Sequence, residues 1–162
     1  MSDLRSNNDI IEIIEKLKKI HPEAECSLDF NTPFEMAIAV ILSAQCTDER
    51  VNKITPALFK KHSTPEDFNK IKIEDLEKLI YSCGFYKNKA KNITLLANTL
   101  IEKYDGELPQ NIDGLIKLPG IGRKSANVIM LEAFNKPVGI AIDTHAKRIS
   151  NRLRSFPRKR SI

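Results

Sequence analysis

The sequence predicts an all-α protein, and three observations support this prediction. Apolar residues recur at spacings of three and four along most of the chain, which is the pattern of amphipathic helices. No segment alternates apolar and polar residues over the length of a strand, and the chain contains no internal repeat. Breaks rich in glycine and proline separate the periodic segments, at Gly84, at residues 106–109 and at residues 119–120. The chain is therefore expected to be a set of short, connected helices.

The predicted helices follow in order. The first covers residues 10–20, where isoleucine and leucine alternate with charged residues at helical spacing. The second starts after Thr32, because threonine followed by Pro33 and Glu35 forms a capping box that provides acceptors for two early amide N–H groups. Its apolar run continues to Cys46 and is typical of a buried central helix. Further helices are expected over residues 48–61, from residue 64, over residues 74–82 and 87–104, on both sides of residues 118–122, and from residue 144.

Composition and charge narrow the function classes. The chain has 162 residues, of which 41% are hydrophobic and 29% charged, so it can bury a core and is not a disordered, collagen-like or disulfide-stapled chain. The net charge is +5, but it is unevenly distributed. Residues 1–80 carry 11 basic and 15 acidic side chains, residues 81–151 carry 10 and 6, and residues 152–162 carry five basic and none acidic. A surface that binds a polyanion is therefore expected in the second half of the chain.

The cysteines and the apolar segments predict neither a metal site nor a membrane span. Cys26, Cys46 and Cys83 have no zinc-like or iron–sulfur spacing, so reduced thiols and no bound metal are expected. The longest apolar run, residues 36–42, is too short to cross a bilayer. The polar N-terminus has no signal-peptide pattern, and a cytoplasmic protein is expected.

The strongest chemical signal lies in residues 112–133. Two helices are predicted there, joined by a turn at residues 118–122 whose two glycines allow a tight bend and leave amide N–H groups bare at the start of the second helix. Bare amides and the positive end of the helix dipole suit a phosphate. Arg123 and Lys124 follow directly, where the dipole disfavours cations, and this indicates an anion or a reaction at that position. An ordinary interhelical turn is the alternative.

Lys124 and Asp143 are the candidate catalytic residues. The dipole and Arg123 both favour a neutral Lys124 amine, which is able to attack an aldehyde or a C1′ carbon, although charge alone favours a phosphate-contacting lysine. Asp143 suits the N-cap of the helix that begins at Thr144, and a carboxylate there equally suits oxocarbenium stabilisation or proton transfer. Both readings of Asp143 stay open at this point. His145 is expected to make local hydrogen bonds.

Four segments, in order, resemble motifs of the endonuclease III family of DNA glycosylase/AP lyases. Residues 118–127, LPGIGRKSAN, resemble its helix–hairpin–helix, and residues 142–145, IDTH, are similar to the segment of its catalytic aspartate. Residues 42–48, LSAQCTD, and residues 84–90, GFYKNKA, fit two further family segments. The resemblance extends from about residue 8 to Leu153.

The resemblance implies a domain organisation. Residues 26–136 are expected to form a six-helix barrel with the helix–hairpin–helix at residues 112–133. Residues 1–25 would contribute a helix to the family's second helical domain, and residues 137–162 would hold the start of that domain and a basic tail.

The resemblance also implies base excision repair of duplex DNA, with removal of oxidised pyrimidines and cleavage at abasic sites. Lys124 would attack C1′ of a flipped nucleotide and form a Schiff base, and β-elimination of the 3′ phosphate would follow with help from Asp143. Gln45 lies in the segment that fills the gap left by the flipped base. Phe85 replaces the leucine that the family inserts into the stack, so its ring is expected to act as the wedge, although its place after a turn alone suggests a core aromatic. The other expected DNA contacts are Lys89, Gly120, Gly122 and Arg123.

The sequence departs from the family pattern after Leu153. Typical members continue into further helices and a C-x6-C-x2-C-x5-C loop that holds a [4Fe–4S] cluster, and these cysteines are absent from the sequence, so no cofactor is expected. The change at residues 154–162 is abrupt, which suggests a frameshift or premature stop, and an intact mass matching an uninterrupted frame to Ile162 would contradict it. A natural basic tail that binds DNA phosphates is the alternative.

Other functions stay open beside the enzyme, which is expected to be a monomer in a bacterial cytoplasm, associated with the nucleoid. A noncatalytic or inactive helix–hairpin–helix module would bind DNA without forming a covalent adduct. A protein-binding module that uses the apolar face of residues 10–20 would show no salt-dependent affinity for DNA. An 8-oxoguanine glycosylase with the same lysine is a further alternative, which the segments at residues 42–48 and 84–90 fit less well.

Overall fold

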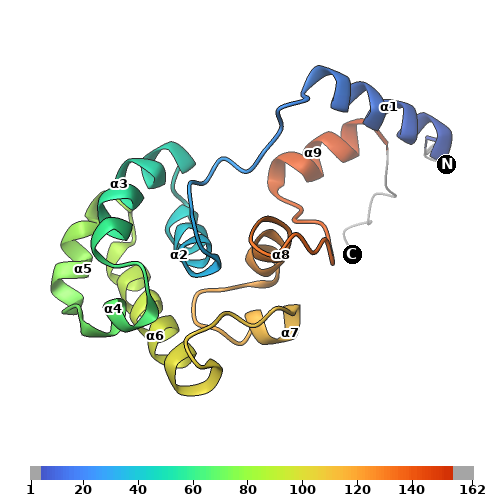
Figure 1. The fold of residues 1–162 in the computed structure, drawn as a ribbon. Coiled ribbons are helices and arrows are strands. Elements are labelled where there is room, and N and C mark those ends of the chain that lie inside the picture. Colours follow the sequence, from blue (N-terminus) through green and yellow to red (C-terminus); the bar gives the residue numbers. More distant parts are fainter. Residues whose placement is uncertain (1–4, 155–162) are drawn as a thin grey trace, which may run out of the picture. The chain divides into compact units, whose positions relative to one another are not determined.

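The computed structural model of the chain describes residues 5–154, and within that range every regular element is a helix (Figure 1). The all-α prediction is therefore confirmed. The described residues divide into two compact units, a larger one from Cys26 to Ala141 and a smaller one made of residues 5–25 and 142–154. Residues 137–141, which the sequence assigned to the second domain, group with the larger unit. Most of the predicted basic tail, residues 155–162, lies outside the described residues.

The larger unit is built around α2 (Pro33–Ser43). Every residue of α2 from Phe34 to Leu42 is buried, as predicted for a central helix, and the helix packs against α3, α6 and α8. The other helices of this unit are α3 (Asp48–Lys61), α4 (Pro65–Lys70), α5 (Ile73–Leu79), the 3-10 helix η1 (Tyr81–Cys83), α6 (Tyr86–Tyr104), α7 (Ile112–Leu115) and α8 (Arg123–Glu132). In Figure 1, α6 runs beside α4 and α5, and both pack against it.

The two ends of α2 differ from the prediction in detail. Thr32 caps the helix, and its hydroxyl accepts the Glu35 N–H at 3.1 Å. The Glu35 carboxylate turns to Asn31 and accepts its backbone N–H at 2.7 Å, so it stabilises the residue before the cap instead of the cap itself. The helix ends at Ser43, before the predicted Cys46, because the backbone leaves helical geometry at Ala44 (ψ 114°) and is left-handed at Gln45 (φ 52°).

The smaller unit pairs the two ends of the described chain. It contains α1 (Asn7–Ile20) and α9 (Thr144–Arg152). The Arg5 backbone N–H donates to the carbonyl of Arg154 at 3.2 Å, and its guanidinium Nε donates to the carbonyl of Leu153 at 2.9 Å. The start of α1 therefore lies beside the end of α9. No residue of α1 is buried, and Ile11, Ile14 and Leu17 are exposed. Within residues 5–154 no helix is long and apolar enough to span a membrane.

Candidate active site and nucleic-acid interface

The helix–hairpin–helix consists of α7, the turn at residues 118–122 and α8. The side chains of Leu118 and Ile121 are buried and anchor the turn in the core of the larger unit. Gly120 has a φ of +79°, and a Cβ at this position would lie 3.1 Å from Cβ of Asn92 and 3.2 Å from the side chain of Ile41. Only glycine fits that backbone and that approach to α6 and α2. The sequence therefore identified a turn that packing also requires.

The start of α8 leaves its first amides without a side-chain acceptor. Gly122 is the N-cap, its backbone is extended, and a Cβ built on it would meet nothing within 4 Å. The first turn contains no acidic residue, and both Arg123 and Lys124 are exposed there. Uncapped N–H groups, the positive end of the helix dipole and two cations make this surface attractive to an anion such as a DNA phosphate.

The candidate catalytic residues lie in different units. Lys124 belongs to the larger unit, in the exposed first turn of α8, as predicted. Asp143 belongs to the smaller unit and caps α9, where its Oδ1 accepts the N–H of Ala146 at 2.6 Å. The predicted capping role of Asp143 is thus confirmed. His145 also bonds locally, because the Arg148 guanidinium lies 3.1 Å from its Nδ1.

Gln45 and Phe85 share an unusual backbone. Both have left-handed φ angles, 52° and 46°, and both side chains are exposed. Phe85 has 71% of its surface accessible, so the core alternative for its ring is wrong. Gly84 precedes it with φ 61° and ψ 153°, a region that only glycine populates. Left-handed non-glycine residues cost free energy and are typical of functional sites.

Lys89 lies in a different environment from the one predicted. The sequence grouped it with the DNA contacts, but only 4% of the residue is exposed. Its Nζ donates to the backbone carbonyls of Leu42 at 2.8 Å and Cys83 at 2.6 Å. Burial lowers the pKa of the ammonium, which the nearby thiols of Cys46 and Cys83 oppose. Since both hydrogen bonds turn the ammonium inward, the expected DNA contact is replaced by a contact within the protein.

The sequence reasoning missed a cationic hollow on α9. It has a volume of about 340 Å³ and is lined by Thr144, Lys147, Arg148, Asn151 and Arg152. Three of these five side chains are basic, and α9 has no acidic residue in its first turn. The signal was present in the sequence as Lys147, Arg148 and Arg152 on one predicted helix, but the charge count assigned Arg152 to the tail.

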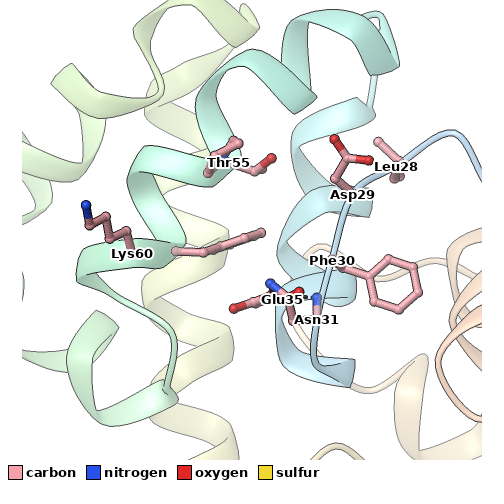
Figure 2. A pocket seen from close by; sticks show the side chains of 9 residues that line it. Leu28, Asp29, Phe30, Asn31, Glu35, Thr55 and Lys60 are labelled. Carbon is pink, nitrogen blue, oxygen red and sulfur yellow. Dashed lines mark hydrogen bonds between the residues drawn. The ribbon is translucent and has the colours of Figure 1, made fainter.

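A second hollow, of about 610 Å³, lies between α3 and the segment before α2 (Figure 2). Glu35 and Thr55 line it and are buried, and Lys60 lies at its edge in the same view. None of the residues expected to bind DNA lines this hollow.

Comparison with known proteins agrees with this geometry. A model described as "HhH-GPD superfamily base excision DNA repair protein" matches residues 38–161. The chain therefore belongs to the helix–hairpin–helix superfamily of base excision repair proteins. Within that superfamily it is a member of the endonuclease III family, because it is 41% identical to endonuclease III of Escherichia coli and covers 70% of that protein.

Three further relatives in this family are longer than this chain. It is 49% identical to endonuclease III of Synechocystis over 142 residues and 50% identical to that of Bacillus subtilis over 140 residues. These matches cover 88% and 86% of this chain, but 65% and 64% of the relatives. A solved structure described as a trapped endonuclease III–DNA covalent intermediate matches with a TM-score of 0.86 at 48% identity, over 91% of this chain and 68% of that one. The chain thus spans about two thirds of the length of these relatives.

The residues present do not fit the iron–sulfur cluster that the family resemblance implies. Burial, together with the charge of Cys46 and a hydrogen bond with it, raises the pKa of the Cys83 thiol to about 11. Burial also raises the pKa of Cys26. Among the described residues, no three His, Cys, Asp or Glu side chains gather closely enough to hold a metal ion.

Proposed function

We propose that this chain is a DNA glycosylase/AP lyase of base excision repair that acts on duplex DNA containing oxidised pyrimidines or abasic sites. The observation that carries the proposal is the start of α8, where uncapped amides next to Gly122 adjoin the exposed Lys124. A phosphate held by those amides would place the sugar of an extruded nucleotide near the lysine amine. The trapped covalent endonuclease III–DNA complex that matches this fold supports the same chemistry.

The proposed reaction has two stages, release of the base and cleavage of the strand. The Lys124 amine, once it has given up its proton, attacks C1′ and the glycosidic bond breaks, so the bonding electrons leave with the base, which takes up a proton. Ring opening then gives a Schiff base between Lys124 and C1′. A general base then removes a proton from C2′, and β-elimination follows, in which the 3′ phosphate leaves and the strand is cut. Asp143 is the proposed carboxylate that stabilises the cationic sugar and transfers protons.

Gln45 and Phe85 are the proposed residues that enter the duplex. Extrusion of a nucleotide leaves a gap in the stack, and an exposed aromatic ring beside it is able to wedge between bases. The left-handed backbone at both residues projects them from the ends of α2 and η1. Arg123, Gly120 and Gly122 would contact the phosphates. We propose that the enzyme acts as a monomer, without a cofactor, in a bacterial cytoplasm.

Borohydride trapping on a duplex with one abasic site tests the lyase. The 162-residue chain is expected to form a covalent adduct, and Lys124→Ala is expected to abolish it. Lys117→Ala is the matched control, because Lys117 is an exposed lysine of the same hairpin. Asp143→Asn preserves a good N-cap and is expected to slow adduct formation about a hundredfold. DNA binding without any adduct in the unmodified chain would instead support a noncatalytic DNA-binding module.

A further inference from the structure

The ammonium of Lys89 joins two segments, each of which carries one of the five exposed left-handed residues of the described chain. Its Nζ donates to the carbonyl of Leu42, in the last turn of α2, and to the carbonyl of Cys83, the last residue of η1. Gln45 follows the first carbonyl by three residues, and Phe85 follows the second by two. One nitrogen atom therefore holds the backbone just before Gln45 and just before Phe85.

The chemistry of the surroundings explains why a charged group occupies this buried position. Carbonyls at the C-terminal end of a helix lack intrahelical donors and lie at the negative end of the helix dipole. A buried ammonium is unfavourable unless it is hydrogen-bonded, and within residues 5–154 no carboxylate forms an ion pair with Lys89. An apolar side chain would fill the space without that cost. The ammonium therefore has a specific role in holding these two carbonyls.

The strained backbone near these carbonyls needs such a constraint. A non-glycine residue persists in the left-handed region only where its surroundings over-determine it, and here Gln45 and Phe85 are both solvent-exposed. Few contacts of their own side chains hold them in place. The hydrogen bonds of Lys89 act just before each of them, on the backbone that sets their direction.

We propose that Lys89 is a positioning residue that holds Gln45 and Phe85 at a fixed spacing, so that both enter the duplex together when a nucleotide is extruded. This inference rests on the proposed function. Lys89 does not touch DNA, and its effect passes through the two loops. Removing its charge should therefore weaken binding to damaged DNA more than binding to intact DNA, which depends on the phosphate contacts of α8.

The test compares Lys89→Met with two controls in the full 162-residue chain. Lys91→Met removes the same charge from an exposed position of α6, and Leu100→Ala removes core packing from the same helix. Each variant is titrated against an intact duplex and a duplex with a tetrahydrofuran abasic analogue next to 2-aminopurine, whose fluorescence reports unstacking. Lys89→Met is expected to lose at least tenfold in affinity for the abasic duplex and most of the fluorescence change, with affinity for the intact duplex within twofold. Both controls are expected to keep the preference for the abasic duplex.

Two further measurements keep the outcomes separate. Amide hydrogen exchange of the free protein is expected to speed up at residues 44–46 and 84–86 in Lys89→Met and not in Lys91→Met. If Lys89→Met does not fold, Lys89→Gln, which retains donor N–H groups, is used in its place and is expected to show part of the loss. Phe85→Ala is expected to lose the preference, and adding Lys89→Met to it should cost little more.

The contrary results are equally definite. Unchanged exchange at both loops, or an abasic preference in Lys89→Met equal to that of the unmodified chain, would overturn the inference. An equal loss in Leu100→Ala would reduce Lys89 to a stability residue and overturn it as well. If the unmodified chain itself does not distinguish abasic from intact duplex, the proposed function fails, and the DNA role of Lys89 fails with it, whatever the exchange shows.

Discussion

Five helices of the larger unit begin in two different ways. Helices α2, α3 and α4 each have a threonine N-cap, namely Thr32, Thr47 and Thr64. Each also has at least one acidic residue in its first turn. Helices α6 and α8 have Phe85 and Gly122 as N-cap residues, and neither has a side-chain cap or an acidic residue in its first turn. The first group satisfies the free amides and the dipole within the protein. The second group leaves both available to an external anion, at some cost in stability.

The largest expected effect comes from giving α8 the kind of start that α2 has. Gly122→Asp would cap the helix and add a favourable charge at its N-terminus, so the free energy of unfolding should rise by about 0.5 kcal/mol. A carboxylate where a phosphate is proposed to bind should cost about 3 kcal/mol, or about a hundredfold in DNA affinity. Urea unfolding and fluorescence anisotropy with a duplex measure the two effects. Gly122→Ser, which adds a neutral cap, is the control. Unchanged DNA affinity in Gly122→Asp would show that the start of α8 does not contact DNA.

The next effect separates the two glycines of the hairpin. Gly120→Ala must adopt a φ near +79° and approach Asn92 and Ile41, so it should lower the free energy of unfolding by about 2 kcal/mol. Gly122→Ala has ordinary extended geometry and open space around its Cβ, so its loss should be much smaller. Urea denaturation of both variants checks this difference. Equal losses would mean that the turn relaxes around a Cβ at Gly120.

A smaller effect is expected at a capped start. Thr32→Ala removes the acceptor for the Glu35 N–H and should lower the free energy of unfolding by about 1 kcal/mol. DNA affinity, measured below the unfolding transition, should stay unchanged. Thr32→Ser keeps the hydroxyl and should remain close to the unmodified protein. A loss of DNA affinity in the Ala variant would show that the two kinds of helix start are not independent.

The smallest effect concerns pH at α4. Hydrogen bonds from the backbone N–H of Ser63 and from Thr64 hold the pKa of Asp67 below its ordinary value of 3.8. Because the folded value is the lower one, this carboxylate stabilises the fold fully above pH 3.8, and its contribution disappears as the pH falls through the folded pKa. The difference in Tm between the unmodified chain and Asp67→Asn should therefore be greatest at neutral pH and should disappear as the pH falls below the folded pKa of Asp67. A difference that grows on acidification would contradict the assignment.

Local signals in the sequence predicted the helices and their caps well. Thr32 and Asp143 cap the helices that the sequence predicted them to cap. Such caps are predictable because the capping side chain lies within three residues of the amide N–H that donates to it. The first turn of α8 was also correctly placed, since Gly122 and the cations after it are contiguous in sequence. Short-range geometry of this kind is encoded where it acts.

Contacts between distant segments could not be predicted. Lys89 stands among polar neighbours in the sequence and resembles a solvated helix lysine, but its partner Leu42 is on another helix. Only the packing of α6 against α2 decides that its ammonium turns inward. The early end of α2 has the same origin, because the apolar run to Cys46 continues past the point where the backbone turns left-handed at Gln45.

The discontinuity of the smaller unit has a consequence for synthesis in the cell. Residues 5–25 leave the ribosome before residues 142–154, with which they pair, because the whole larger unit is made between them. Domains generally fold as units during translation, so the larger unit has a complete set of helices to fold while α1 still waits for α9. The hydrogen bonds of Arg5 with Leu153 and Arg154 thus form only after the larger unit has been made.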